Sequence, residues 1–524
     1  MGNETKKLIT LGSFSVIYNN WLPYAAGCLI SYCKAIPEID NNYQFNDPLY
    51  EQKPIEMYKS ILEETDILGL TCYVWNQSYN DNLAKYFKKI KPNGIVVYGG
   101  PQVPEDPELK EEFDKRPYID TSIAGLGEIS FAEFLLGNPL SGNKLLRMPT
   151  PYLDGTFDNL LDKCDDFKVS FETNRGCPYN CSFCDWGGQA RSKITMFNIE
   201  EIYKTIEEIY THKNISELEI LDANFGILPR DIDIIDKMIE CQNKNDNELR
   251  ISYSGLAKNG SKHLPIIMEK IFNNLPIDQR NLKISFQTHT DEVLKLIDRN
   301  NIDNNKLIPL INEFKKKGIP TTSEMIIALP GETAESWLST LDYNYHGLGI
   351  NFVRTYILHV VANTPLYKNV KEQTYGIKTK KVIYKENQVE IIHQCNSFDL
   401  DEIKLMFSYF WLFNTLVNTN ILKDKIKNLK NEIKFLHENI QTMPYIKSLL
   451  DQYLLLVEKV FQDVDITYLD SNMEINFFNN TLRGNEIEDI SRNGDLFLKD
   501  LSKYYDNLPK LEFNKLNGAL STIC

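Results

Sequence analysis

Three cysteines near the middle of the chain carry the clearest chemistry in the sequence. Cys177, Cys181 and Cys184 have the spacing C-x3-C-x2-C, directly after an apolar run that predicts a β-strand. Thiolates are the ligands of iron-sulfur clusters, which usually take four of them. Three cysteines therefore predict a [4Fe-4S] cluster in which one iron stays open to an external ligand.

A structural zinc site is the alternative use of clustered cysteines. Tetrahedral zinc needs a fourth Cys or His ligand. No histidine lies between Thr173 and Lys193. The spacing and the missing fourth ligand favour the iron-sulfur interpretation.

The cysteine segment resembles the signature of the radical S-adenosylmethionine (SAM) superfamily, including the aromatic Phe183 just before the third cysteine. The resemblance implies that SAM binds the open iron. One electron, from an external donor of flavodoxin or ferredoxin type, then cleaves SAM to a 5′-deoxyadenosyl radical, which abstracts hydrogen from an unactivated carbon.

Polar residues also end later predicted strands, where that superfamily places its SAM contacts and where β/α barrels carry catalysis. By resemblance, we expect Asp222, Gln287 and Glu324 to contact SAM and Ile327 to flank its adenine. Each polar residue has a plainer alternative role as a strand-end or helix cap.

The N-terminal region resembles the cobalamin-binding domain of B12-type radical SAM enzymes, and with the cysteine region the resemblance covers the first 365 residues or so. It implies that the turns at Trp75-Asn76 and Gly99-Gly100 line a corrin at the carboxyl edge of a parallel sheet. No Asp-x-His-x-x-Gly segment is present, and Gly125–Glu128 replaces the usual Gly-Glu-Gly-Glu. The missing histidine is compatible with the radical SAM branch, many members of which bind cobalamin without such a ligand, but it also suits a vestigial domain that binds no cobalamin.

Cys395 is the candidate that bears on the reaction. Peptide epimerases of the proteusin pathways, which this chain resembles in domain order, use a cysteine after the barrel to return a hydrogen atom to the substrate radical. The leading hypothesis is therefore epimerisation of a ribosomally made peptide, with Cys395 as hydrogen donor. A buried free cysteine is the other interpretation. A cobalamin-dependent C-methyltransferase is the alternative enzyme, and a corrin or iron-sulfur sensor is the non-catalytic one.

Alternating strand and helix patterns must position these residues. They predict an α/β protein with a doubly wound, Rossmann-like domain over 1–148, a partial β/α barrel over 160–365 and a mainly helical domain over 366–524. In the last part, a connector leads to long helices predicted over 401–418 and 424–463.

Composition limits the partners. The 57 basic residues fall short of the 72 acidic ones, for a net charge of −15, so we expect no nucleic-acid partner. No uninterrupted apolar stretch is long enough to span a membrane. The ten cysteines are too sparse for a disulfide scaffold, and we expect the protein in the cytoplasm.

Overall fold

The computed structural model describes most of the chain. The described residues are 6–15, 20–139, 149–163, 165–187, 193–253, 262–274, 282–384, 387–418, 422, 426–461, 466–468 and 494–505. The predicted domain ends at residues 148 and 524 lie outside these ranges, so the three predicted boundaries stay predictions.

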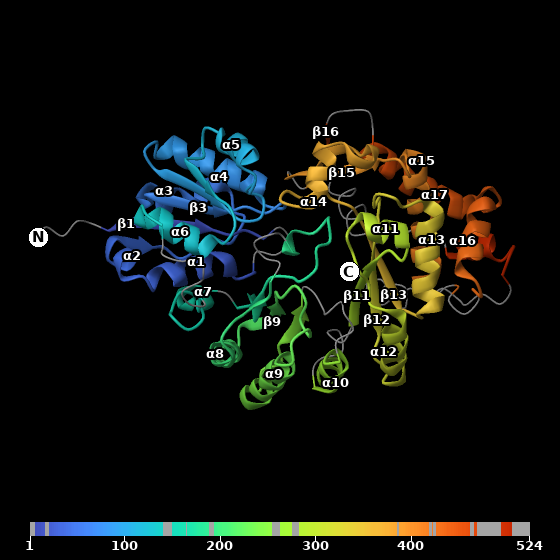
Figure 1. The fold of residues 1–524 in the computed structure, drawn as a ribbon, viewed down its shortest axis with the longest axis horizontal. Coiled ribbons are helices and arrows are strands. Elements are labelled where there is room, and N and C mark those ends of the chain that lie inside the picture. The colour runs from blue at the N-terminus through green and yellow to red at the C-terminus, as the bar shows by residue number, and fades with distance from the viewer. Residues whose placement is uncertain are drawn as a thin grey trace, which may run out of the picture.

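Five parallel strands form the N-terminal sheet, in the order β2-β1-β3-β4-β5. The strands are β1 Lys7–Gly12, β2 Tyr43–Phe45, β3 Ile67–Thr71, β4 Ile95–Gly99 and β5 Thr121–Ile123. The helices between them are α1 Tyr24–Lys34, α2 Pro37–Asn42, α3 Lys59–Glu64, α4 Gln77–Ile90, α5 Pro107–Asp114 and α6 Gly127–Leu136. The predicted doubly wound arrangement is confirmed (Figure 1).

Both faces of this sheet are covered because successive side chains of a strand point to opposite faces. Leu68 and Leu70 pack with Phe87 of α4 on one face. Ile67 packs with Ile30 of α1 on the other. Helices α3, α4 and α5 accordingly lie on one side of the sheet, and α1, α2 and α6 lie on the other (Figure 1).

The middle of the chain holds two parallel three-stranded sheets, ordered β10-β9-β6 and β11-β12-β13. Their strands are β6 Phe167–Phe171, β9 Ile215–Ile220, β10 Arg250–Tyr253, β11 Leu282–Gln287, β12 Thr321–Ile327 and β13 Phe352–Ile357. Their parallel order, with helices between most of them, agrees with the predicted partial β/α barrel. Among the described residues, no ladder joins β10 to β11.

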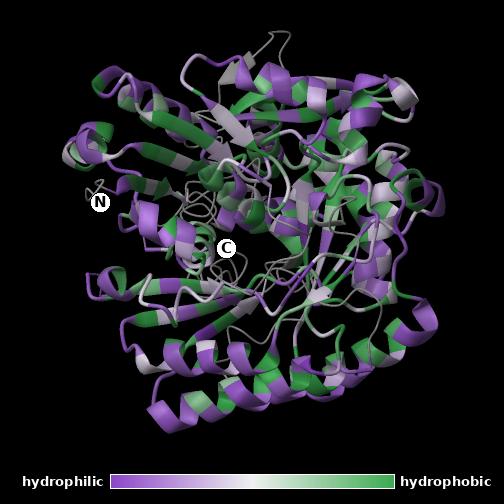
Figure 2. Ribbon diagram, turned by 60° about the vertical axis from the view of Figure 1, so that its left-hand side comes forward, coloured by the Kyte–Doolittle hydropathy of each residue, from purple (hydrophilic) through white to green (hydrophobic). Residues whose placement is uncertain are grey.

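Helices α8 Ile199–Thr211, α9 Asp231–Asn245, α10 Leu264–Asn274, α12 Asn304–Lys316 and α13 Ala334–Asp342 cover the outer side of these two sheets (Figure 1). Helix α11 Asp291–Leu296 lies instead at the carboxyl ends of the strands, and the short helix α7 Asp158–Leu161 precedes β6. Hydrophilic residues line the outer turns of these helices, whereas the strands are rich in hydrophobic ones (Figure 2). The barrel core is thus built between helices and strands.

The C-terminal part is mainly helical but differs from the prediction in two ways. First, it contains a sheet in which β14 (Lys378–Tyr384) pairs antiparallel with β15 (Asn387–Gln394) and parallel with β16 (Ile466–Tyr468). Second, the single helix predicted over 424–463 is two helices, because Pro444 starts a new one. Proline fits the first turn of a helix, where its missing N–H is not needed, and does not fit the interior.

The remaining helices of this part are α14 Pro365–Lys371, α15 Leu400–Phe413, α16 Leu429–Glu438, α17 Pro444–Val460 and α20 Gly494–Leu501. A π-helical turn, η7 (Asn414–Asn418), extends α15 to the end of its predicted range. No helix among the described residues combines the length and apolarity needed to cross a membrane.

Candidate functional site

The cysteine loop follows β6 and is held in place from both sides. Cys177 and Cys181 are buried, at 3% and 5% exposure, while Cys184 is half-buried. The backbone N–H of Ser182 donates to the Ile297 carbonyl at 2.8 Å, and the Ser182 carbonyl accepts from the Leu366 N–H at 2.7 Å. The loop is therefore fixed against the end of α11 and the start of α14.

The donor set fits an iron-sulfur cluster, because one loop carries three free cysteines and such clusters take cysteine thiolates as ligands. Two thiols also receive side-chain N–H groups, from Asn224 to Cys177 at 3.1 Å and from Arg299 to Cys181 at 3.6 Å. Such donors suit thiolate sulfur.

Asp222, near the beginning of the loop after β9, positions the start of the cysteine loop. Its carboxylate accepts from the backbone N–H groups of Thr173 at 2.8 Å and Asn174 at 3.3 Å, and also from both of their side chains. Burial raises the pKa of Asp222 to about 7, although these hydrogen bonds oppose the shift. The expected SAM contact stays a prediction, whereas the contacts to the loop are direct.

Gln287 and Glu324 lie at neighbouring positions on the barrel. Gln287 ends β11 with a positive φ of 67°, and its side-chain oxygen is buried without a hydrogen-bond partner in the described part of the chain. Glu324, on β12, accepts from the Ser285 hydroxyl at 2.5 Å. A buried acceptor without a donor is costly, so Gln287 fits the predicted role of binding a ligand that carries N–H or O–H groups.

Ile327 is the last residue of β12 and is fully buried. Its carbonyl accepts from the Leu358 N–H at 3.0 Å, and Ala328 after it has a positive φ of 68°. The chain therefore turns sharply at the position where the adenine of SAM was expected.

Asn76 ties together the two loops at the topological switch point of the N-terminal sheet. In the order 2-1-3-4-5 this point lies between β1 and β3, where doubly wound folds bind ligands. The Asn76 amide donates to the carbonyls of Phe14, after β1, and Thr71, at the end of β3, both at 3.1 Å. Its oxygen accepts from the Tyr73 N–H at 2.8 Å. Asn76 thus shapes the ligand edge through its own contacts.

Trp75 presents its ring at this edge. It is 41% exposed and stacks on Tyr73, with ring centroids 4.6 Å apart and planes 11° from parallel. An exposed aromatic face on a fixed partner suits contact with a flat ring system.

Gly99 and Gly100 form the next turn along the edge, and the surroundings of Gly100 require a glycine. At Gly100, with φ of 97°, an added Cβ would lie 2.8 Å from the Cys72 carbonyl oxygen, so the close approach of two backbones excludes a side chain. At Gly99, an added Cβ would meet only the Ile123 carbonyl, at 3.8 Å. The described surroundings of Gly99 would therefore accept a side chain, and its contact with a corrin stays a prediction.

Two contacts that sequence reasoning missed join this edge to the cysteine loop. Arg175 bonds Glu172 beside it and Glu128 at the start of α6, with an Nη1 to Oε1 distance of 3.0 Å to Glu128. Burial alone would lower the pKa of Arg175, but the two carboxylates raise it. The sequence shows Arg175 next to the cysteine motif and Glu128 at the end of the Gly125–Glu128 segment. Nothing in the sequence indicates that these two side chains form an ion pair.

Asn363 makes the second contact, from the segment after β13. Its amide donates to the carbonyls of Pro101 at 3.0 Å and Val103 at 2.9 Å, and its oxygen accepts from the Glu105 N–H at 2.8 Å. Three residues later, Leu366 bonds the cysteine loop at Ser182. Residues 363–366 thus connect the turn after Gly100 with the cysteine loop.

Cys395 follows β15 and is buried, at 7% exposure. Its sulfur lies 3.1 Å from the Ser397 hydroxyl, which in turn accepts from the Gly331 N–H at 3.0 Å. Gly331 follows the end of β12, so Cys395 lies near the loop that leaves the predicted adenine position. Its role as hydrogen donor stays a prediction.

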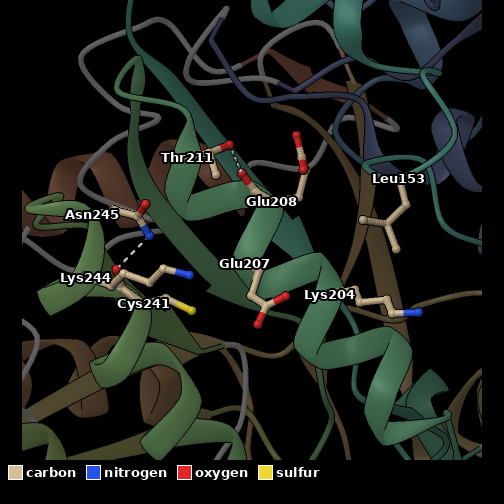
Figure 3. Close-up of a pocket in the computed structure, with 8 residues that line it drawn as sticks. All are labelled: Leu153, Lys204, Glu207, Glu208, Thr211, Cys241, Lys244 and Asn245. Carbon is tan, nitrogen blue, oxygen red and sulfur yellow. Dashed lines mark hydrogen bonds between the residues drawn. The ribbon is translucent and has the colours of Figure 1, made fainter.

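A surface pocket lies elsewhere, between the C-terminal halves of α8 and α9 (Figure 3). Lys204, Glu207 and Glu208 of α8 face Cys241 and Lys244 of α9 across it. Helix C-termini point to the end of the barrel opposite the cysteine loop, because the strands run the other way. This pocket is not part of the candidate site.

Known proteins resemble this chain in both sequence and fold. The model of the Radical SAM superfamily matches residues 171–343. The cobalamin-dependent radical SAM methyltransferase TokK of Streptomyces tokunonensis is 32% identical over 392 residues, which are 68% of this chain and 56% of TokK. The 2-(S-pantetheinyl)-carbapenam-3-carboxylate methyltransferase of Streptantibioticus cattleyicolor is 28% identical over 424 residues, 73% of this chain and 61% of that enzyme. The chain thus spans less than two thirds of either relative.

A solved structure extends the likeness of fold to nearly the whole chain. The cobalamin-dependent SAM radical enzyme OxsB, solved with aqua-cobalamin, superposes with a TM-score of 0.57 over 99% of this chain and 84% of OxsB, at 14% identity. The cysteine loop at the barrel edge, the matched superfamily model and the doubly wound N-terminal sheet lead to one conclusion: the chain belongs to the radical SAM superfamily, in the branch that carries an N-terminal domain of the B12-binding fold.

Proposed function

We propose that this chain is a cobalamin-dependent radical SAM methyltransferase that adds a methyl group to an unactivated carbon. The observation that carries the proposal is the double connection between the N-terminal ligand edge and the cysteine loop, through Arg175 and through residues 363–366. Transfer of a methyl group from a corrin to a substrate radical requires both cofactors to face one space. The names of the relatives TokK and the carbapenam methyltransferase support the same reaction.

The residues divide the work as follows. When bound, the cluster and SAM supply a 5′-deoxyadenosyl radical, and cobalamin supplies the methyl group. Cys177, Cys181 and Cys184 hold the cluster, and Gln287 and Glu324 orient SAM from two adjacent strands. Trp75 and the turn at Gly99 and Gly100 would receive the corrin. No Asp-x-His-x-x-Gly segment is present, so that motif would supply no histidine to cobalamin.

Methylation replaces epimerisation as the leading hypothesis. The relatives named above are methyltransferases, and nothing in their names points to a peptide substrate. A methyl transfer also leaves no substrate radical to be quenched, so it assigns Cys395 no chemical step. The electron donor of flavodoxin or ferredoxin type remains part of the proposal, because cleavage of SAM consumes one electron.

The test uses the purified chain, reconstituted anaerobically with iron, sulfide and hydroxocobalamin. It receives SAM labelled with a CD3 group, a low-potential reductant and 2-(S-pantetheinyl)-carbapenam-3-carboxylate, the substrate named for one relative. We expect bound cobalamin, both S-adenosylhomocysteine and 5′-deoxyadenosine, and transfer of the labelled methyl to a substrate of this or a related class. Cys177→Ala should form no 5′-deoxyadenosine.

Epimerisation gives a different pattern. A precursor peptide treated in D2O would gain one deuterium for each altered residue, without S-adenosylhomocysteine. The proposal is contradicted if the protein, reconstituted with its iron-sulfur cluster, forms 5′-deoxyadenosine but binds no cobalamin and makes no S-adenosylhomocysteine.

A further inference from the structure

Two side chains from separate barrel loops direct N–H groups at the cysteine sulfurs. Asn224, in the loop after β9, places its amide nitrogen 3.1 Å from the sulfur of Cys177. Arg299, after α11, places a guanidinium nitrogen 3.6 Å from the sulfur of Cys181. Asn224 is 2% exposed and Arg299 5%, so water competes little for either donor.

Arg299 is fixed by contacts other than the one to sulfur. Its Nε donates to the Phe286 carbonyl at 3.2 Å and to the Asn301 side-chain oxygen at 2.9 Å, and its Nη2 donates to the Ser285 carbonyl. These three acceptors anchor the planar guanidinium and leave Nη1 for Cys181. The charge is thus held beside one particular thiol and does not move freely.

Asn224 has a different supporting feature. Its side-chain oxygen is buried with no hydrogen-bond partner in the described residues, so the thiol is the one partner seen for this amide there. The nitrogen of the Asn224 amide, which is its donor, is the atom that faces the sulfur of Cys177.

The electrostatic consequence follows from the charge that a cluster would bring. Three thiolates give the site an excess of negative charge, and reduction adds one electron to it. An N–H dipole or a guanidinium beside the sulfurs stabilises the reduced form more than the oxidised form, which raises the reduction potential. Burial strengthens the effect because the local dielectric constant is low.

We infer that Asn224 and Arg299 are positioning residues that set the reduction potential of the cluster, through Cys177 and Cys181 respectively. They thereby decide how readily the protein accepts the electron that starts the reaction. The inference rests on the cluster of the proposed function, but it does not depend on cobalamin or on the identity of the substrate. It can therefore be wrong while the proposed methyl transfer is right, and it can be right while the proposed methyl transfer is wrong.

The test is an EPR-monitored redox titration of the reconstituted full chain, without SAM. Arg299→Met should make the midpoint potential more negative by about 59 mV. For a one-electron couple this corresponds to about a tenfold change in the equilibrium between the oxidised and reduced cluster. Asn224→Leu should shift it in the same direction by less, because an amide carries no net charge. Asn224→Asp, which turns a donor into an acceptor, should shift it further than Asn224→Leu. Arg299→Lys keeps the charge and should restore part of the shift.

Matched control variants exist for both residues. Arg230 is a second arginine near the loop, but it donates to the carbonyls of Phe197 and Thr173 and not to sulfur. Asn247 is a buried asparagine that bonds the carbonyls of Tyr210 and His212, each at 3.1 Å. Arg230→Met and Asn247→Leu should leave the midpoint unchanged even if they lower stability.

Two results overturn the inference. One is an unchanged midpoint in Arg299→Met and Asn224→Leu with full iron loading. The other is failure of these variants, and of the milder Arg299→Gln, to bind iron while their circular dichroism matches that of the unmodified protein, which would assign the residues to cluster assembly.

Discussion

At the scale of single residues, the buried carboxylate of Asp222 holds the start of the cysteine loop by hydrogen bonds. Asp222 is almost fully enclosed, yet its carboxylate meets four donors from Thr173 and Asn174. Removing the carboxylate would take an acceptor from each of these donors, and an unpaired buried donor costs about 1–3 kcal/mol. This side chain therefore supports the cysteine loop whether or not it also contacts SAM.

We expect Asp222→Ala to lower the free energy of unfolding by about 2–4 kcal/mol, because several donors lose their acceptor together. Urea unfolding of the purified chain measures the change. Thr173→Val, which removes only the side-chain donor, should cost less. Equal stability of Asp222→Ala and the unmodified protein would contradict the positioning role.

The same residue predicts a pH dependence. Burial raises the pKa of Asp222 from its ordinary 3.8 to about 7 in the folded state, so the folded state binds this proton more tightly than the unfolded chain does. The stability that Asp222 contributes is therefore largest at low pH and falls as the pH rises from about 4 to about 7. The difference in unfolding free energy between the unmodified protein and Asp222→Asn should decrease over that interval. A difference that is constant with pH contradicts the raised pKa.

Cys395 separates the two reactions considered for this enzyme. Methyl transfer needs no hydrogen donor, so Cys395→Ala should keep the rate of labelled methyl transfer within about twofold, the range of a small change in packing. Cys395→Ser serves as the control, since it keeps the size and the hydrogen bond to Ser397. Loss of product in both variants, with normal formation of 5′-deoxyadenosine, would favour the hydrogen-donor role.

At the scale of elements, the segment after β13 positions both the 101–105 turn and the cysteine loop. Its sequence alone does not predict this role. Asn363 has a positive φ of 65°, a conformation that Asn tolerates better than most residues. It holds the 101–105 turn by three hydrogen bonds, while Leu366 holds the cysteine loop. A substitution in this segment should therefore affect both the 101–105 turn and the cysteine loop.

Asn363→Gly keeps the backbone conformation and removes all three bonds. We expect faster hydrogen exchange in residues 101–105 and weaker binding of hydroxocobalamin, because the turn after Gly100 loses its anchor. Exchange measured by mass spectrometry reports the first effect. Asn363→Asp keeps the acceptor for the Glu105 N–H and should protect that amide. Unchanged hydrogen exchange of residues 101–105 in Asn363→Gly would show that this turn is stable without the Asn363 hydrogen bonds.

At the scale of the whole molecule, one buried ion pair crosses from the N-terminal sheet to the barrel. Glu128 and Arg175 have side-chain exposures of 7% and 19%. Removing one partner of a buried pair is costly because the other charge stays desolvated, at about 3–5 kcal/mol for complete burial. Glu172 remains to pair with Arg175, which lessens the cost.

We expect Glu128→Gln to destabilise the protein by about 1–3 kcal/mol and to lower the cooperativity of urea unfolding, since it weakens the contact between two parts. Asp114→Asn breaks the i,i+4 pair with Lys110 on α5 and should change stability by less than about 0.5 kcal/mol. A Glu128→Gln variant as stable as Asp114→Asn would mean that packing alone joins the parts.

The sequence by itself determined the cysteine motif and the alternation of strands and helices in the first two regions, because these depend on local spacing and on hydrophobic periodicity. It also placed Trp75, Asn76, Gly99 and Gly100 at strand ends that the sheet order then brought to one edge. The strands β14 and β15 escaped prediction, since their lysines and glutamates suggested a solvated connector until pairing and burial against the barrel were seen.

Only the tertiary structure decided which distant residues meet. Asn224 lies 47 residues from Cys177, Arg299 lies 118 from Cys181, and Asn363 lies 262 from Pro101. Such contacts have no local signature, because each residue is acceptable in its own loop and its partner is set by how sheets and helices pack. The chemistry could thus be read from the cysteine spacing, while the groups that tune and align it became visible once the chain was folded.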